Sequence, residues 1–134
     1  MLLRTDNLPW PISQELRNIL QHEVNASGKD LRHGVVINFR DPEYSAGSGG
    51  YHPVEVSISG DGALIYCTDF CIHGLPPHAE IAKEIDFDFG QQVFQHMHQV
   101  YPIKKGRELF KVWEQNFIQY YKNDVYEVQV STGW

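Results

Sequence analysis

The stretch VEVSISGDGALIYCTDFCI, residues 54–72, contains two strand patterns joined by a turn. In residues 54–58 apolar and polar side chains alternate, as in a strand with one buried face. Asp61 and Gly62 follow, and an Asp-Gly pair predicts a type I′ hairpin turn, in which both central residues have positive φ. Residues 63–72 are apolar on both faces, which predicts a central strand that is covered on both sides. This stretch therefore predicts a hairpin at the centre of an antiparallel sheet.

Three further segments extend the predicted sheet. Apolar and polar side chains also alternate in residues 33–40, and the Asp-Pro pair that follows ends this strand pattern. Residues 126–130 alternate as well and are expected to form a short last strand. Residues 85–97 are expected to form one strand with a bulge or bend at Gly90. The expected sheet has about five antiparallel strands.

Helical spacing appears near both ends of the chain. Apolar residues at positions 12, 16, 19 and 20 predict an amphipathic helix that ends near residues 25–28. A second helix after Pro102 is rich in aromatic residues. Its apolar surface includes Phe110, Val112 and Ile118, more than one core-facing stripe needs, so we expect it to contribute to a subunit interface as well. Phe110→Lys or Ile118→Lys is then expected to shift the mass in solution without unfolding the chain.

These elements predict an α+β fold in which a twisted antiparallel β-sheet is flanked by an N-terminal and a C-terminal helix, both packed on one face. Residues 1–134 are expected to form a single domain, with residues 1–10 as an N-terminal arm.

Composition disfavours several partners. The chain has 11 Lys and Arg against 17 Asp and Glu, a formal net charge of −6. Nucleic-acid affinity depends on neutralising phosphates, and the basic run at residues 104–107 is short, so we expect no nucleic-acid and no membrane partner. The sequence has no apolar stretch of about 18 residues and no signal peptide, which predicts a cytoplasmic protein.

The two cysteines are expected to be free. Cys67 and Cys71 lie four residues apart on one strand face, which puts their Cα atoms about 13 Å apart, beyond the reach of a disulfide. Free thiols suit a reducing compartment. The same separation disfavours a zinc site built with His73 and His78, so we interpret the thiols as small buried apolar groups.

Two other polar sets are interpreted as solvated. Glu84, Asp86 and Asp88 alternate along one strand and are expected to form its polar outer face rather than bind Mg²⁺. His96 and His98 would share a strand face and are likewise expected to be solvated. The sequence therefore assigns no metal ligand.

A Gly/Ser-rich loop, residues 43–51, is bracketed by polar residues. The loop lacks the Gly-Lys-Ser/Thr that opens a phosphate-binding helix and leads into a strand, so no nucleotide or other cofactor is expected. An Arg–carboxylate network at its mouth would either fix the loop, which is the preferred interpretation, or mark a ligand site. No catalytic residue is assigned. The candidate ligand- or partner-binding residues are Arg40, Asp41, Tyr44, Ser45, His52, Glu55 and Asp69.

Several of these residues carry a family resemblance. The segments are NFRDP (38–42), YS (44–45), GGYHPVE (49–55), TDF (68–70) and EIDFDF (84–89). In these segments the chain resembles the bacterial domain of unknown function numbered 2787, short proteins found on pathogenicity islands and other mobile elements of gamma-proteobacteria such as Vibrio.

Known structures of that family are similar to the mitochondrial acidic matrix protein that binds the globular heads of complement C1q, a ring-shaped trimer of twisted sheets flanked by helices. The resemblance implies a similar fold and a homo-oligomer, a dimer or trimer, and supplies no catalytic residue. We therefore expect a non-enzymatic, self-associating protein-binding module with an unknown protein partner.

The alternative is a small-ligand or metal-dependent enzyme that uses Arg40, Asp41, His52 and Glu55. An enzyme would bring these side chains together in a concave pocket with perturbed pKa values, whereas a binding module would leave them paired with one another.

Overall fold

The computed structural model describes residues 1–45, 47–74, 77 and 79–132. The helices are α1 (Gln14–Ser27) and α2 (Arg107–Lys122), and a short 3-10 helix, η1 (Ile103–Gly106), leads into α2. The strands are β1 (Val35–Arg40), β2 (Val54–Ile58), β3 (Leu64–His73), β4 (Glu80–Asp88), β5 (Val93–His96), β6 (Gln99–Pro102) and β7 (Glu127–Thr132).

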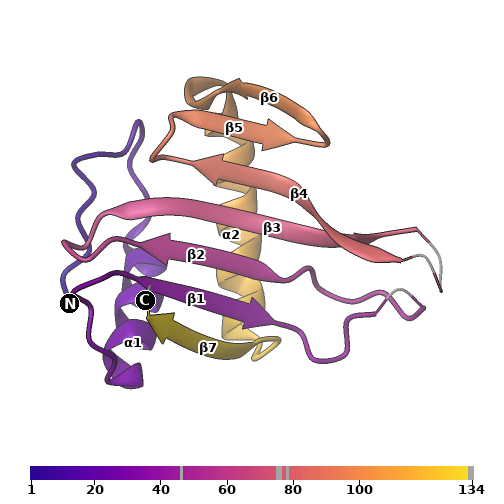
Figure 1. Ribbon diagram of the computed structural model, residues 1–134, viewed down its shortest axis with the longest axis horizontal. Helices are drawn as coiled ribbons and strands as arrows, with labels where there is room; N and C mark the ends of the chain where they lie inside the picture. Colours follow the sequence, from indigo (N-terminus) through magenta and orange to yellow (C-terminus); the bar gives the residue numbers. More distant parts are fainter. Residues whose placement is uncertain (46, 75–76, 78, 133–134) are drawn as a thin grey trace.

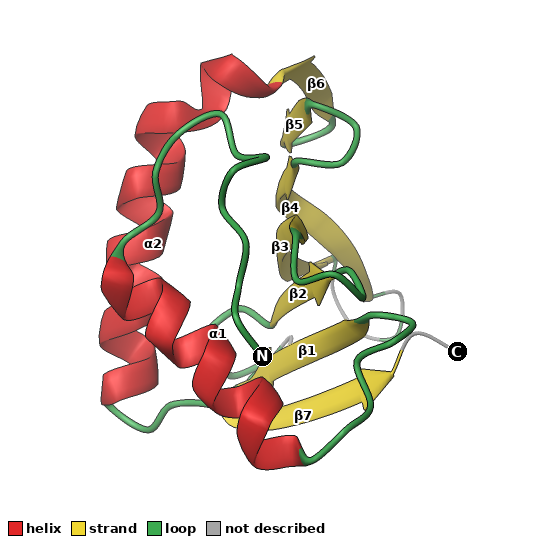
Figure 2. Cartoon of the chain, turned by 90° about the vertical axis from the view of Figure 1, so that its left-hand side faces the viewer, coloured by secondary structure: helices red, strands yellow, loops and turns green. Residues whose placement is uncertain are grey.

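The molecule has two layers, a twisted sheet and a pair of helices that cover one of its faces (Figures 1 and 2). The strand order is β6-β5-β4-β3-β2-β1-β7, and every neighbouring pair is antiparallel. This confirms the predicted α+β class and the placement of the helices on one face. In the described residues, no helix is both long and apolar enough to cross a membrane.

Helix α1 has clear start and stop signals. The Ser13 side chain caps its first turn by accepting a hydrogen bond from the backbone N–H of Leu16 at 3.1 Å. The helix ends where Gly28 adopts a left-handed conformation with φ 67°. Leu16, Leu20 and Val24 are buried against the rest of the fold.

The core lies between the sheet and the helices. Phe110, Trp113 and Phe117 of α2 are buried, and Phe117 meets Phe39 of β1 edge to face with centroids 4.8 Å apart. The N-terminal arm is part of this core, because Trp10 is only 3% exposed and its ring centroid lies 5.4 Å from that of Phe110.

The burial of two α2 residues, Phe110 and Ile118, corrects the expected effect of replacing either one with lysine. Phe110 and Ile118 are 0% and 9% exposed, so a lysine at either position would place a charge in the core and unfold the chain. The apolar surface of α2 is wide because the helix packs against both the sheet and the arm. Val112, by contrast, is 55% exposed.

The edge of the sheet formed by β4, β5 and β6 differs from the prediction. β4 begins at Glu80, and the chain turns at residues 89–92 instead of continuing through Gly90 as one bent strand. Gln92 at φ 60° helps to close this turn. A second turn after His96, with His98 at φ 74°, leads to β6, so the sheet has seven described strands rather than about five, and His98 is not on a strand.

The hairpin between β2 and β3 forms as predicted but with another turn type. Gly62 has φ 89°, whereas Asp61 is absent from the described residues with positive φ. The backbone N–H of Gly62 donates to Ser59 O at 3.0 Å, and Ser59 N–H donates to Ala63 O at 2.8 Å. This is a type I turn followed by a left-handed glycine, the three-residue alternative to type I′.

β3 is central, as predicted, but only one of its faces is covered by helices (Figure 2). On the open face its side chains are shielded by neighbouring strands. Thr68 is 1% exposed, and its hydroxyl donates to Asp86 at 2.7 Å. The hydroxyl of Tyr66 donates to Glu55. Cross-strand polar pairs thus replace the second covering layer that the apolar pattern predicted.

Candidate functional site

A β-bulge between β3 and β4 determines where Glu84 points. Asp69 pairs with Ile85 and Phe70 pairs with Lys83, so Glu84 has no residue directly opposite it. A bulge of this kind changes the alternation of side chains between the two faces. Glu84 therefore lies on the helix side with Asp69, and not on the open face with Asp86.

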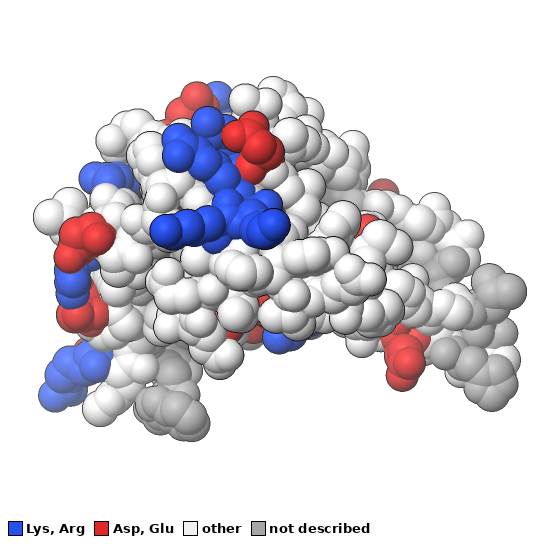
Figure 3. All heavy atoms as spheres, turned by 90° about the horizontal axis from the view of Figure 1, so that it is seen from above, with Lys and Arg blue, Asp and Glu red and all other residues white. Residues whose placement is uncertain are grey.

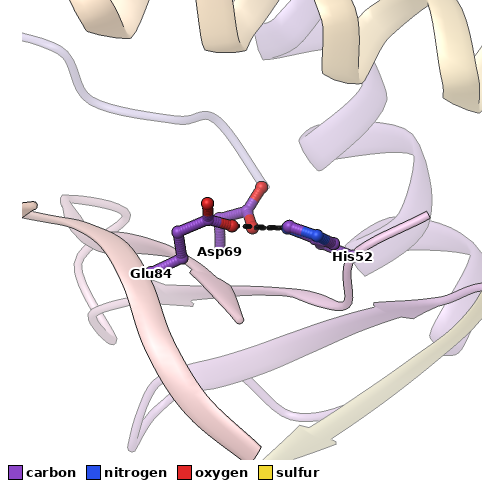
Figure 4. A group of neighbouring side chains, drawn as sticks. All are labelled: His52, Asp69 and Glu84. Carbon is purple, nitrogen blue, oxygen red and sulfur yellow. Dashed lines mark hydrogen bonds and ion pairs between the residues drawn. The ribbon is translucent and has the colours of Figure 1, made fainter. Parts of the chain in front are cut away.

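His52, Asp69 and Glu84 converge at this bulge (Figure 4). The Nδ1 atom of His52 lies 2.9 Å from Asp69 Oδ1 and 2.7 Å from Glu84 Oε2. All three potential ligand atoms lie within 4.8 Å of one another. His52 comes from the segment that leads into β2, Asp69 from β3 and Glu84 from β4, so the fold assembles the group from three separate segments.

The charges of this trio, His52, Asp69 and Glu84, do not balance. The hydrogen bond that His52 donates to the Asp69 carboxylate raises the pKa of His52, helped by the charge of Glu84 and opposed by burial. A protonated His52 compensates only one of the two carboxylates. A single Nδ1–H also donates to one oxygen at a time, although two carboxylate oxygens lie within reach. The group thus has an excess of negative charge and of acceptors.

A cavity of about 320 Å³ adjoins the trio, between the sheet and α2. Tyr51 and Tyr120 border it with their ring centroids 4.5 Å apart. Among the described residues that line it there is no Lys or Arg. The trio is therefore the charged part of a pocket that is otherwise lined mainly by aromatic and aliphatic side chains.

The structure brings together three of the seven predicted site residues. His52 and Asp69 belong to the trio. Tyr44 lies beside them, with its ring centroid 5.6 Å from that of His52. The Tyr44 hydroxyl accepts a hydrogen bond from the backbone N–H of Ile72 at 2.9 Å, which attaches the loop to β3.

Asp41 and Ser45 act within the loop instead. The Asp41 carboxylate accepts hydrogen bonds from the backbone N–H groups of Glu43 at 2.9 Å and of Tyr51 at 3.0 Å, which ties the two ends of the loop together. The Ser45 hydroxyl lies 2.6 Å from that of Ser48. Ala46 lies outside the described residues.

Arg40 and Glu55 lie apart from the trio. Glu55 accepts from the Tyr66 hydroxyl on the open face of the sheet. Arg40 is exposed and forms no ion pair with a described residue. The predicted Arg–carboxylate network is therefore wrong: Asp41 holds the loop through backbone N–H groups, which are closer than any guanidinium.

The other carboxylates of β4 also differ from expectation. Asp86 is only 8% exposed, accepts from Thr68 and lies 3.4 Å from Lys83 Nζ, so it is a partly buried, paired group rather than part of a solvated face. Asp88 accepts a hydrogen bond from the backbone N–H of Gln91 at 2.9 Å. Both are thus engaged in holding the sheet and its turn.

Cys67 and Cys71 are free and buried, as predicted. Burial raises the pKa of both thiols, which makes them poor nucleophiles at neutral pH. Cys71 Sγ lies 3.1 Å from His73 Nε2. His78, the last member of the zinc set considered above, lies outside the described residues.

A basic patch lies at the start of α2. Lys104, Lys105, Arg107 and Lys111 are all exposed, and Figure 3 shows Lys and Arg side chains gathered on this face beside acidic ones. None of these four residues lines the cavity. The basic run at residues 104–107 is thus a solvated helix start.

Sequence reasoning missed Glu84 as a site residue. Strict alternation groups it with Asp86 and Asp88, and only the bulge separates them. One signal was available: Asp69 is a carboxylate on an apolar strand face and requires a polar partner. That partner is His52, and Glu84 joins it.

A sequence with this fold matches a described family. The chain belongs to the family described as "Protein of unknown function (DUF2787)", which it matches over residues 14–131. No match was found among curated proteins.

Two solved structures from Vibrio cholerae are similar to the chain. The hypothetical protein VC0508 of the VSP-II pathogenicity island is 32% identical, with a TM-score of 0.80, over 97% of this chain and 99% of that one. The conserved hypothetical protein VC1805 of pathogenicity island VPI-2 is 33% identical, with a TM-score of 0.77, over 90% of this chain and 95% of that one. VC1805 is described as sharing structural homology with the human P32 protein.

Proposed function

We propose that this chain is a small cytoplasmic binding module that holds a divalent transition-metal ion on His52, Asp69 and Glu84. The observation that supports the proposal is the convergence of one imidazole nitrogen and two carboxylate oxygens within 4.8 Å of one another. One nitrogen and two oxygens form a donor set that suits ions such as Zn²⁺, Mn²⁺ or Fe²⁺ better than Ca²⁺, which prefers oxygen ligands alone.

The spacing of the donor atoms supports the same proposal. With metal–ligand distances of about 2.0–2.2 Å and tetrahedral geometry, neighbouring ligand atoms lie about 3.3–3.6 Å apart. The Nδ1 atom of His52 lies 2.9 Å and 2.7 Å from the two carboxylate oxygens. The imidazole would need to move away from the two carboxylate oxygens by about 0.4–0.9 Å to accept an ion.

The competing interpretation is purely structural. A protonated His52 would then serve only as an ion-pair partner that fastens the segment before β2 to β3 and β4. Metal binding requires a neutral His52, whose Nδ1 lone pair becomes the ligand. The two interpretations therefore differ in whether the purified protein takes up an ion in a fixed ratio.

Titration calorimetry with Zn²⁺ at pH 7, on protein first stripped with a chelator, tests the proposal. We expect one ion per chain, and at least about tenfold weaker binding in His52→Ala. His22→Ala removes an exposed histidine of α1 and is the matched control, which should leave binding unchanged. Failure to bind in a fixed ratio, or an equal loss in both variants, would contradict the metal site.

Self-association is a second proposal, based on a different part of the sheet. Ile81, Met97 and Val100 are 61%, 62% and 63% exposed, and they belong to β4, the β5–β6 turn and β6. β6 ends the described sheet, with one edge lacking a strand partner in that part of the chain. An unpaired edge with exposed apolar side chains can pair with the same edge of a second copy.

Light scattering tests this association. A dimer is expected for the unaltered chain and a monomer for Val100→Lys, because the lysine would lie in the shared interface. Val112→Lys alters an exposed apolar residue on α2 and should leave the dimer intact. A monomeric unaltered chain would refute pairing along β6.

A further inference from the structure

The two walls of the cavity differ in chemistry. The trio lies on the wall formed by the sheet. The opposite wall is α2, whose lining side chains carry no charge: Leu109, Val112, Trp113, Asn116, Phe117 and Tyr120. A ligand in this space would contact the polar side chains of the trio on one wall and an aliphatic and aromatic surface on the other.

The protein donors also leave part of a bound ion uncovered. All three come from the segment before β2, from β3 and from β4, so they approach from the sheet side, and α2 passes across the other side of the group (Figure 4). A divalent transition-metal ion takes four to six ligands. Its remaining coordination positions would therefore point into the cavity.

We propose that the metal-loaded pocket takes a small acid with an apolar body. Its acidic head group completes the coordination of the ion, and its body packs against α2. This inference rests on the metal site proposed above. The cavity of about 320 Å³ is at the small end of ligand pockets, which suits a molecule the size of a single aromatic ring with a short head group.

Charge limits the ligand class further. Two carboxylates already balance the two charges of the ion, and no Lys or Arg is present among the described lining residues. A phosphate ester or other polyanion would bring uncompensated negative charge into the pocket. A head group with one negative charge is therefore favoured.

The rim of the cavity supports an apolar body. Val112 is 55% exposed and Tyr51 is 42% exposed, and both line this space. Large apolar side chains that remain in contact with water beside a pocket gain from being covered by a ligand. The ring of Tyr51 also lies against that of Tyr120, 4.5 Å between centroids, so the rim is an aromatic surface.

Two hydroxamates that differ only in the body provide the test. Acetohydroxamate and benzohydroxamate carry the same metal-chelating head group, and only the second has an aromatic ring. In calorimetry on the zinc-loaded protein, benzohydroxamate should bind at least about tenfold tighter. In Val112→Asn, which adds no charge to the pocket, this preference should shrink several-fold, while Zn²⁺ affinity stays unchanged, because Val112 contacts the body and not the ion.

Three other outcomes of these measurements would each overturn one step of the proposal. Equal binding of the two hydroxamates to zinc-loaded protein overturns the apolar body and leaves the metal site standing. Equal binding of benzohydroxamate with and without zinc overturns the role of the ion in holding the ligand. Absence of zinc uptake, measured before either hydroxamate is added, overturns the metal site and this inference together.

Discussion

Phe87 of β4 and Phe110 of α2 meet edge to face, with their ring centroids 5.0 Å apart. Trp10 of the N-terminal arm contacts the same Phe110 ring at 5.4 Å. Sheet, helix and arm therefore meet at one side chain, which is fully buried. Because three elements meet at Phe110, we expect this side chain to contribute strongly to the stability of the fold.

Phe110→Ala should lower the free energy of unfolding by about 3–5 kcal/mol, because it removes apolar burial and leaves a cavity where three elements meet. Val112→Ala on the same helix should change it by less than about 0.5 kcal/mol, since Val112 is largely exposed. Urea unfolding followed by tryptophan fluorescence measures both. Similar values for the two variants would show that Phe110 is not a core residue.

His52→Ala should destabilise the metal-free protein by about 1 kcal/mol, because it leaves the Asp69 and Glu84 carboxylates facing each other without a cation, partly screened by solvent. Adding Glu84→Gln should recover part of this loss by removing one of the two like charges. Urea unfolding in the presence of a chelator gives the three values. Strictly additive losses would mean that the side chains do not interact.

Gly62→Ala should lower the free energy of unfolding by at least about 1 kcal/mol. Gly62 has φ 89°, and a Cβ atom there would lie 2.7 Å from the carbonyl oxygen of Leu2. The substitution thus strains the β2–β3 turn and pushes away the N-terminal arm. Gly47→Ala, where a Cβ would have open space, is the matched control. Thermal unfolding should show a lower midpoint for Gly62→Ala alone.

Glu114 should make stability depend on pH. Burial raises its pKa, although the backbone N–H of Ser13 donates to its carboxylate at 2.9 Å. Because the folded pKa lies above the unfolded value of about 4.3, the contribution of Glu114 is present below that pH and is lost as the pH rises through the folded pKa.

Relative to Glu114→Gln, the unaltered chain should therefore lose stability as the pH is raised from 4 to 7. Urea midpoints of both proteins across this range measure the difference. Glu108→Gln, at an exposed position on the same helix, is the control. A difference that stays constant or grows in favour of the unaltered chain with rising pH would contradict the raised pKa.

Much of the fold follows from local patterns in the sequence. The alternation in residues 54–58, the Asp-Gly turn and the aromatic spacing after Pro102 predict β2, the central hairpin and α2, because each depends on residues close in sequence. The sequence pattern indicates the short strands β5 and β6 less clearly. Four residues carry too little periodicity to separate a hairpin from a bend at Gly90.

For a similar reason, the sequence could predict two residues of the trio but not the third. His52 and Asp69 stand out as polar residues beside apolar strands. Glu84 requires knowledge of the bulge, and a bulge is a property of two paired strands that neither strand shows alone. The surroundings of Arg40 could not be predicted from the sequence either. Its expected carboxylate partners lie near it in the sequence, but in the fold they form hydrogen bonds with other groups.

The pairing of β1 with β7 affects how the chain is made. Residues 35–40 emerge from the ribosome early, yet their second neighbour, residues 127–132, comes from the far end of the chain. During synthesis one edge of β1 therefore stays open while almost all of the remaining sequence is added. An open edge of this kind can pair with other nascent chains, so the yield of folded protein should depend on how fast translation proceeds to β7.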